Sequence, residues 1–112
     1  MAGTAEERQV CDAAVTLAFS VLGKRWNGMI VSALSGGPTT FVALRRAVSG
    51  ISDTVLSDRL TGLAGAGLVA RTVDAGPPVT VSYALTPSGE GLLPILNQLG
   101  QWASANLAER AH

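Results

Sequence analysis

Hydroxyl side chains recur at helical spacing near the middle of the chain, at Thr54, Ser57 and Thr61. Residues three and four apart lie on one face of a helix, so these three hydroxyls would project together. Hydroxyls can hydrogen-bond to base edges or to phosphate oxygens, and threonine methyl groups can contact the methyl group of thymine. The pattern favours contact with a DNA groove, although serine and threonine are also ordinary residues of a solvated helix surface.

Cations and further hydroxyls flank this segment. Arg45 and Arg46 end the helix that is expected before the hydroxyl-bearing helix, and positive charge at a helix end suits the helix dipole with or without DNA. The functional interpretation of these two arginines is that they bind phosphates at the rim of the groove. Arg59 lies near the inner edge of the hydroxyl-bearing helix, so it either reaches a phosphate or pairs with an acid and holds that helix in place. Ser52 before the helix and Thr80 in the following hairpin complete the candidate DNA-binding set.

Enzyme chemistry is not supported by the residues present. The chain has one histidine and one cysteine, and it shows neither paired carboxylates in a signature motif nor a phosphate-binding loop. The glycine-rich stretch 62–67 would lie late in a helix rather than after a strand, where a nucleotide-binding loop is found. We therefore expect no enzyme activity, no catalytic residue, no metal site and no cofactor.

The elements that would position these residues are indicated by apolar periodicity and by glycine and proline. Helices are expected over residues 11–22, from near 25 to 35, 42–48, 53–66 and 87–107, and strands over 68–73 and 80–85, with a short extra strand possible at 39–40. Two helices joined by a glycine turn and followed by a β-hairpin make a winged helix-turn-helix, whose second helix can enter a DNA major groove. The expected fold class is mainly α with a small antiparallel hairpin.

Local signals define several ends of these elements. Ser52 is expected to cap the hydroxyl-bearing helix, and Thr40 is the available cap for the helix before it. Thr86 should cap the last helix, whose first residue is Pro87, a favoured arrangement. Pro94 should remove one hydrogen bond from that helix and kink it.

Apolar stripes predict a core and a second covered surface. In the helix that begins near residue 25, the core pattern is Trp26, Met29, Ile30, Ala33 and Leu34. The last helix carries a heptad-like stripe that no later element covers, and the first helix offers another apolar face. The residues expected at this surface are Val15, Phe19, Leu92, Leu96, Leu99, Trp102 and Ala103. An apolar patch of this kind is unfavourable in water, so we expect a homodimer that forms through its terminal helices.

Length and charge bound the class of protein. A chain of 112 residues predicts one domain over 1–112, with a core at about 11–107 and frayed ends. The net charge is zero, but residues 39–73 carry four arginines against two aspartates, a slight basic bias that permits DNA binding. No run of residues is apolar enough to span a membrane and no secretory signal is visible. The single cysteine cannot form an intrachain disulfide, so a cytoplasmic location is expected.

Four motifs in order carry a resemblance to a known family. The first is a cysteine that opens the first helix, and the second is Leu-Gly-Lys-Arg-Trp at 22–26. The third contains Phe41, Leu44, Arg45, Arg46, Gly50, Ile51, Ser52, Leu56, Ser57, Arg59 and Leu60. The fourth contains Tyr83, Leu85, Thr86, Pro87 and Gly89, followed by Leu-Leu-Pro at 92–94. Over 11–107 the chain resembles the HxlR-type bacterial transcriptional regulators. The resemblance implies a homodimer that binds a pseudo-palindromic operator in double-stranded DNA, as a repressor or an activator; we expect a repressor.

The resemblance also concerns Cys11. In several members of the family the cysteine at this position senses oxidants or electrophiles, which implies a similar role here, and a small-molecule effector is a further possible partner. A position at the start of a helix would favour the reactive thiolate, whereas Asp12 beside it opposes a second negative charge. The alternative is an inert residue that only packs.

The chain departs from the family where many members carry charged side chains. It has Thr61, Gly62, Ala64 and Gly65 in the hydroxyl-bearing helix and Thr80 in the hairpin. Each change removes charge from the half expected to face DNA. The alternative function is therefore a winged helix that serves as a protein-interaction module and does not bind DNA.

Overall fold

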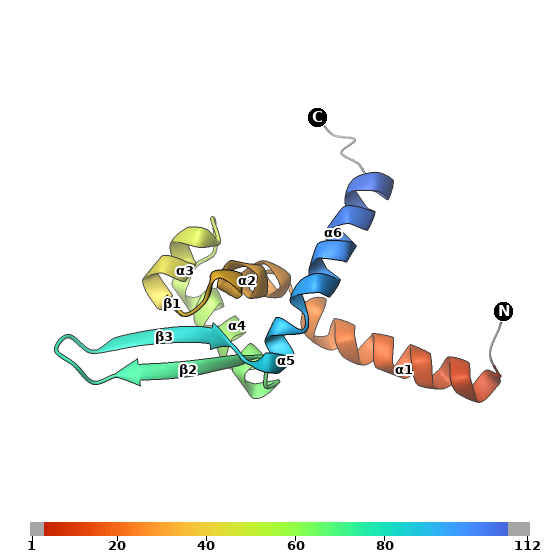
Figure 1. The fold of residues 1–112 in the computed structure, drawn as a ribbon, viewed down its shortest axis with the longest axis horizontal. Coiled ribbons are helices and arrows are strands. Elements are labelled where there is room, and N and C mark those ends of the chain that lie inside the picture. Colours follow the sequence, from red (N-terminus) through yellow and green to blue (C-terminus); the bar gives the residue numbers. More distant parts are fainter. Residues whose placement is uncertain (1–3, 108–112) are drawn as a thin grey trace.

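The protein is mainly helical, with one small sheet and two helices that project from the body (Figure 1). A computed structural model describes residues 4–107, and it describes their side chains except at 7–11. The elements in chain order are α1 (Ala5–Leu22), α2 (Asn27–Ala33), a 3₁₀ turn (Leu34–Gly36), β1 (Thr39–Thr40), α3 (Phe41–Ala47), α4 (Asp53–Gly65), β2 (Val69–Asp74), β3 (Thr80–Leu85), α5 (Pro87–Glu90) and α6 (Leu93–Asn106). Helices α3 and α4 with the β2–β3 hairpin form the predicted winged helix-turn-helix.

The three-stranded antiparallel sheet has the order β1-β3-β2, so the short strand at 39–40 is confirmed. In the hairpin, Arg71 lies opposite Tyr83 and Asp74 lies opposite Thr80. Residues directly opposite each other in an antiparallel pair project to the same face, and successive residues alternate between faces. Arg71 and Tyr83 therefore share the inner face of the sheet with the buried Val69, whereas Thr80 projects from the outer face.

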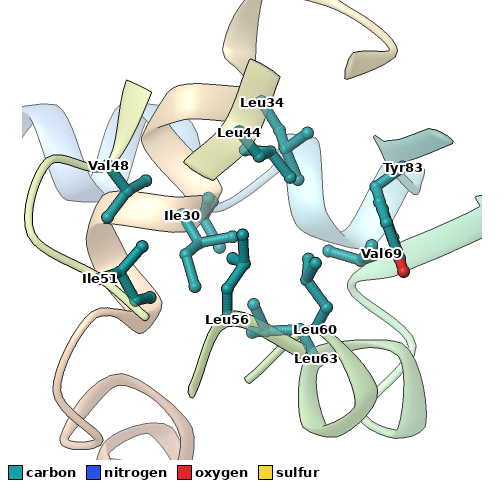
Figure 2. Packing of buried hydrophobic residues seen from close by; sticks show 11 residues of the cluster. Ile30, Leu34, Leu44, Val48, Ile51, Leu56, Leu60, Leu63, Val69 and Tyr83 are labelled. Atoms are coloured by element: carbon teal, nitrogen blue, oxygen red, sulfur yellow. The ribbon is translucent and has the colours of Figure 1, made fainter. Parts of the chain in front are cut away.

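The core lies between α2, α3, α4 and the base of the hairpin (Figure 2). Its buried apolar residues are Ile30, Val31, Leu34, Leu44, Val48, Ile51, Leu56, Leu60, Leu63, Val69 and Tyr83. The three leucines of α4 are all included, as their spacing predicted. The core assignment of Met29 was wrong, because this side chain is 54% exposed. Helix α2 begins only at Asn27, and Trp26 has a left-handed backbone (φ 82°), so a helical pattern counted from Trp26 is out of phase.

All three predicted caps are present. The Oγ1 of Thr40 accepts from the backbone N–H of Ala43 at 3.2 Å, and the Oγ of Ser52 accepts from that of Val55 at 3.2 Å. Thr86 accepts from the N–H of Gly89 at 3.1 Å, with Pro87 at the first helical position. These bonds satisfy donors that the first turn of a helix leaves free, so they define where each helix starts.

The first and last helices differ from the sequence prediction. Helix α1 starts at Ala5, six residues before the expected start at Cys11. The single helix expected after Thr86 is two helices, and the break falls after Glu90. Pro94 lies in the first turn of α6, where its missing N–H has no helical partner to lose, so the chain breaks before the proline and no kink is needed at it.

Helices α1 and α6 carry the apolar surface that the sequence predicted. Val15, Phe19, Leu99 and Trp102 are exposed, whereas Leu92 and Leu96 pack partly against the core. Both helices extend away from the body in different directions (Figure 1). None of the helices in the described part of the chain is long and apolar enough to cross a membrane.

Candidate nucleic-acid interface

The outer face of α4 carries the predicted row of hydroxyls. Thr54, Ser57 and Thr61 are all exposed, and they lie opposite the buried leucines of the same helix. The hydroxyl of Thr61 donates to the backbone carbonyl of Ser57 at 3.0 Å, so its proton is already used within the helix. The hydroxyls of Thr54 and Ser57 have no hydrogen-bond partner among the described residues. The helix thus presents small polar side chains, including the methyl groups of Thr54 and Thr61, to the solvent.

The two arginines that end α3 differ in their surroundings. The Nε of Arg45 lies 3.3 Å from Oδ1 of Asp53, which joins the end of α3 to the start of α4 across the glycine turn. Both side chains are largely exposed, so this ion pair contributes little to stability. Arg46 is exposed and makes no ion pair with any side chain that the structure describes. Arg46 is therefore the arginine of this pair whose charge remains uncompensated.

Arg59 connects α4 to the segment between α1 and α2. Its Nε donates to the backbone carbonyl of Arg25 at 3.0 Å, and its Nη1 lies 2.6 Å from Oδ2 of Asp58. Its side chain is only 23% exposed. Of the two roles that the sequence left open, this geometry matches the one that pairs with an acid and holds α4 in place.

The connection from α1 to α2 is itself held by several contacts. The Nδ2 of Asn27 donates to the carbonyl of Val21 at 2.8 Å, and the guanidinium carbon of Arg25 lies 4.6 Å from the centroid of the Trp26 ring. A Cβ at Gly50 would lie 3.6 Å from the same ring. Asn27 is buried beside this turn and was not predicted from the sequence. Its position directly after a tryptophan at a helix start was the available signal.

The β2–β3 hairpin, which forms the wing of the motif, carries a predicted residue on one face and a residue that was not predicted on the other. Thr80 donates to the carbonyl of Pro78 at 3.3 Å and lies on the outer face of the sheet. Arg71 lies on the inner face, on the same side as α4, and from the sequence it was recognised only as part of the charge balance. Its spacing of two from the buried Val69 was the signal that could have placed it there.

Cys11 lies in the interior of α1 and not at its start. The helix dipole acts within the first turn, so the expected activation of the thiol by a helix N-terminus has no basis in this fold. The side chain of Cys11 lies outside the described residues. Within the part of the chain that the structure describes, no group of histidine, cysteine and acidic residues could hold a metal ion.

A helix-turn-helix with an exposed hydroxyl face, flanking arginines and an attached hairpin defines the winged helix class of DNA-binding regulators. The chain matches the family model of the HxlR-like helix-turn-helix over residues 21–111. It is also similar to the HTH-type transcriptional regulator YodB of Bacillus subtilis (strain 168), at 40% identity over 86 residues, which are 77% of each chain. The protein belongs to the HxlR family and is a winged helix-turn-helix transcriptional regulator.

Solved structures show the same likeness. The reduced form of YodB from B. subtilis superposes with a TM-score of 0.75 at 37% identity, covering 81% of this chain and 89% of that chain. YodB has also been solved in diamide-treated and quinone-bound forms, with TM-scores of 0.71 and 0.73. The redox regulator HypR in its reduced form has a TM-score of 0.77 at 31% identity, covering 83% and 92% of the two chains. These relatives are named as a transcriptional regulator and a redox regulator.

Proposed function

We propose that the protein is a homodimeric repressor that inserts α4 into the major groove of a pseudo-palindromic operator. The observation that carries this proposal is the exposed row of Thr54, Ser57 and Thr61 opposite the buried leucines of α4. The row belongs to the second helix of the motif, which is the one that enters the groove in this class. Family membership supports the same assignment.

The flanking residues then have distinct roles. Arg46, with no ion-pair partner in the described chain, and Arg45 at the same helix end contact phosphates on the groove rim. Ser52 caps the first turn of α4 and so sets where this helix starts. Thr80 contacts the backbone from the wing. Phosphate contacts of this kind set register and affinity, whereas contacts of the α4 hydroxyls to bases set sequence preference.

Mobility-shift titrations at two salt concentrations test this proposal. A dimer should protect two half-sites about one or two helical turns apart. With few uncompensated cations, the salt dependence should correspond to about three to six phosphates at a slope of about −0.9 each. Arg46→Ala should weaken binding to all sequences alike, and Thr54→Ala should change sequence preference, with Ser88→Ala on α5 as a control away from the interface. Equal affinity of wild type and an Arg45/Arg46 double alanine variant would contradict the assignment.

A second copy of the chain is the proposed partner of α1 and α6. Val15 and Phe19 of α1 and Leu99 and Trp102 of α6 are exposed, and no later element of the described chain covers them. Leu92 and Leu96 pack partly against the core at the inner border of this surface, and Ala103 is half-buried further along α6. Association of two such surfaces would remove apolar area from water, which is favourable.

Regulation through Cys11 is the third part of the proposal. Two similar proteins support this part. YodB has been solved in a diamide-treated and a quinone-bound form, and HypR is named as a redox regulator. A single thiol in this chain can respond by a bridge between subunits, by a mixed disulfide with a small thiol, or by an adduct with an electrophile. A lone cysteine also fits a cytoplasmic location, where thiols stay reduced.

Treatment with diamide or a quinone before the DNA titration tests this regulation. Wild type should lose operator affinity, and Cys11→Ser should keep it. Unchanged affinity in both proteins would leave Cys11 as a packing residue. Mass spectrometry of the treated protein distinguishes a subunit bridge from a mixed disulfide or an adduct.

A protein-interaction module is the second candidate function. It is favoured by the ion pairs of Arg45 with Asp53 and of Arg59 with Asp58, which neutralise two of the four arginines of residues 39–73. Selection of bound fragments from genomic DNA separates the two functions. Recovery of a recurrent sequence supports the regulator, and recovery of none supports the module.

A further inference from the structure

A cleft of about 410 Å³ opens between α4 and the wing. It is lined by Ser57, Leu60, Thr61, Ala64, Arg71 and Tyr83. Its walls come from two elements that are joined by the short turn after α4, so it is a feature of the winged-helix unit itself. Arg71, Tyr83 and Ser57 can each donate a hydrogen bond into it, whereas Thr61 already donates to Ser57, and within the described chain no acidic side chain lines it.

Tyr83 brings a hydroxyl without a protein partner into this cleft. Its side chain belongs to the core cluster and is only 8% exposed. Its hydroxyl nevertheless has no hydrogen-bond partner among the groups that the structure describes. Figure 2 shows Tyr83 at the rim of the cluster, with its oxygen directed toward the side on which Leu60 and Leu63 of α4 lie. The residue is buried, but its hydroxyl oxygen is accessible to solvent, so this hydroxyl is free to donate to a group that enters the cleft.

Arg71 supplies the positive charge at the same place. It lies directly opposite Tyr83 in the hairpin, and the two side chains project from the same face of the sheet. In the part of the chain that the structure describes, Arg71 makes neither an ion pair nor a side-chain hydrogen bond. A guanidinium and a phenol hydroxyl side by side are two donors without an acceptor, which is the donor set that an oxyanion requires.

The position of the cleft also suits one anion in particular. In a winged helix bound to DNA, the second helix lies in the major groove and the hairpin lies alongside it. A sugar-phosphate strand borders the major groove on each side, so a strand passes between the helix and the hairpin. The cleft opens at that place, between α4 and the inner face of the β2–β3 hairpin.

We propose that the cleft between α4 and the wing binds a phosphate oxyanion through the guanidinium of Arg71 and the hydroxyl of Tyr83, and that a DNA backbone phosphate is its occupant. Ser57 and Thr61 form the wall on the α4 side. This inference rests on the proposed DNA-binding function. It adds that the depth of α4 in the groove is set from the wing side by a contact that does not depend on base sequence.

The test compares two variants that remove one donor each. Tyr83→Phe deletes only the hydroxyl, and because that hydroxyl has no partner in the described chain, the thermal unfolding temperature should stay at the wild-type value. Its affinity for a mixed-sequence duplex should fall about tenfold, as for loss of a hydrogen bond to a charged group, with the salt slope unchanged. Arg71→Gln should also weaken binding and should reduce the salt slope by about 0.9 for each phosphate released. Ser82→Ala, a hydroxyl deletion on the outer face of β3, is the matched control and should bind as wild type.

A second arm identifies the source of the phosphate. Inorganic phosphate is added to the protein without DNA, and unfolding temperatures are compared for wild type and Tyr83→Phe. Loss of DNA affinity in both variants, with no Tyr83-dependent effect of inorganic phosphate, supports a DNA phosphate as occupant. The opposite result is unchanged DNA affinity in both variants, together with a phosphate-dependent rise in unfolding temperature that Tyr83→Phe abolishes. That result would overturn the DNA phosphate as occupant and show a binding site for a free anion.

The remaining outcomes decide against the cleft or against DNA binding separately. If both variants bind DNA as wild type does, and inorganic phosphate stabilises neither wild type nor Tyr83→Phe, the oxyanion-binding site is refuted. If the wild type binds no duplex at any salt concentration, the DNA-binding function fails, and the inorganic phosphate arm alone then decides whether the site exists.

Discussion

Trp102 offers the sharpest test of how two copies of the chain associate. Its side chain is 53% exposed on α6, close to Leu99, which is 44% exposed. A tryptophan can bury up to about 250 Å², so about 130 Å² of this ring remains open in the single chain. At about 25 cal/mol per Å², covering that area in a dimer contributes about 3 kcal/mol for each protomer, or about 6 kcal/mol for a symmetric pair.

Trp102→Ala should therefore raise the dissociation constant of the dimer by about four orders of magnitude, since each 1.4 kcal/mol is about a factor of ten. Light scattering over a range of concentrations measures the change, and circular dichroism checks that the helices remain. Val79→Ala is a suitable control, because Val79 is also exposed but lies at the tip of the wing. Leu96 is a poorer choice, because it packs against the core and its loss would also disturb the folded chain.

Two results would refute this reasoning. A wild-type protein that is monomeric at micromolar concentration would show that the exposed surface of α6 is not an interface between copies. A Trp102→Ala protein that dimerises as tightly as wild type would place the interface elsewhere. Loss of dimer should also weaken operator binding, although Trp102 lies outside the candidate DNA-binding set.

Three further substitutions test the local geometry of the helix-turn-helix and its attachment. Ser52→Ala should lower the free energy of unfolding by about 1 kcal/mol through loss of the α4 cap, and Ser52→Thr should restore most of it in urea titrations. Gly50→Ala should lower the free energy of unfolding by about 1–2 kcal/mol, because the φ of Gly50 is +93°. Gly36→Ala should lower it less, because Gly36 has no crowding and no positive φ. Equal losses in the two variants would show that the φ of Gly50 is not the cause. Arg59→Met should remove the bond to the Arg25 carbonyl and weaken DNA binding without changing the salt slope; a reduced slope would show that Arg59 reaches a phosphate.

The helix-turn-helix and the hairpin could be predicted because their signals are local. Ser52 is followed by a helix with leucines at helical spacing, and it does cap that helix. The second strand alternates from Thr80 to Leu85, and the structure has β3 at the same residues. Such signals act over a few residues, so they do not depend on how distant segments pack.

The features that could not be predicted depend on contacts between distant segments. Arg59 bonds to a carbonyl 34 residues earlier, and no local pattern indicates which carbonyl it will meet. The pairing of Arg71 with Tyr83 depends on the register of the hairpin, which its long proline-containing tip leaves open. The left-handed backbone of Trp26 shifted the phase of α2, so the helical pattern assigned Met29 to the wrong side.

The place of β2 at the outer edge of the sheet has a consequence for solubility. Beyond Val69, every residue of this strand is exposed, and its outer edge has no partner strand in the described chain. Such an edge can template pairing with another copy and so begin aggregation. Arg71 and Asp74 project from opposite faces of the strand, so each face of this edge carries a charged side chain, and charged side chains on an edge strand disfavour pairing with another strand. The few charges that the wing retains therefore protect a nearly neutral protein from edge-to-edge association.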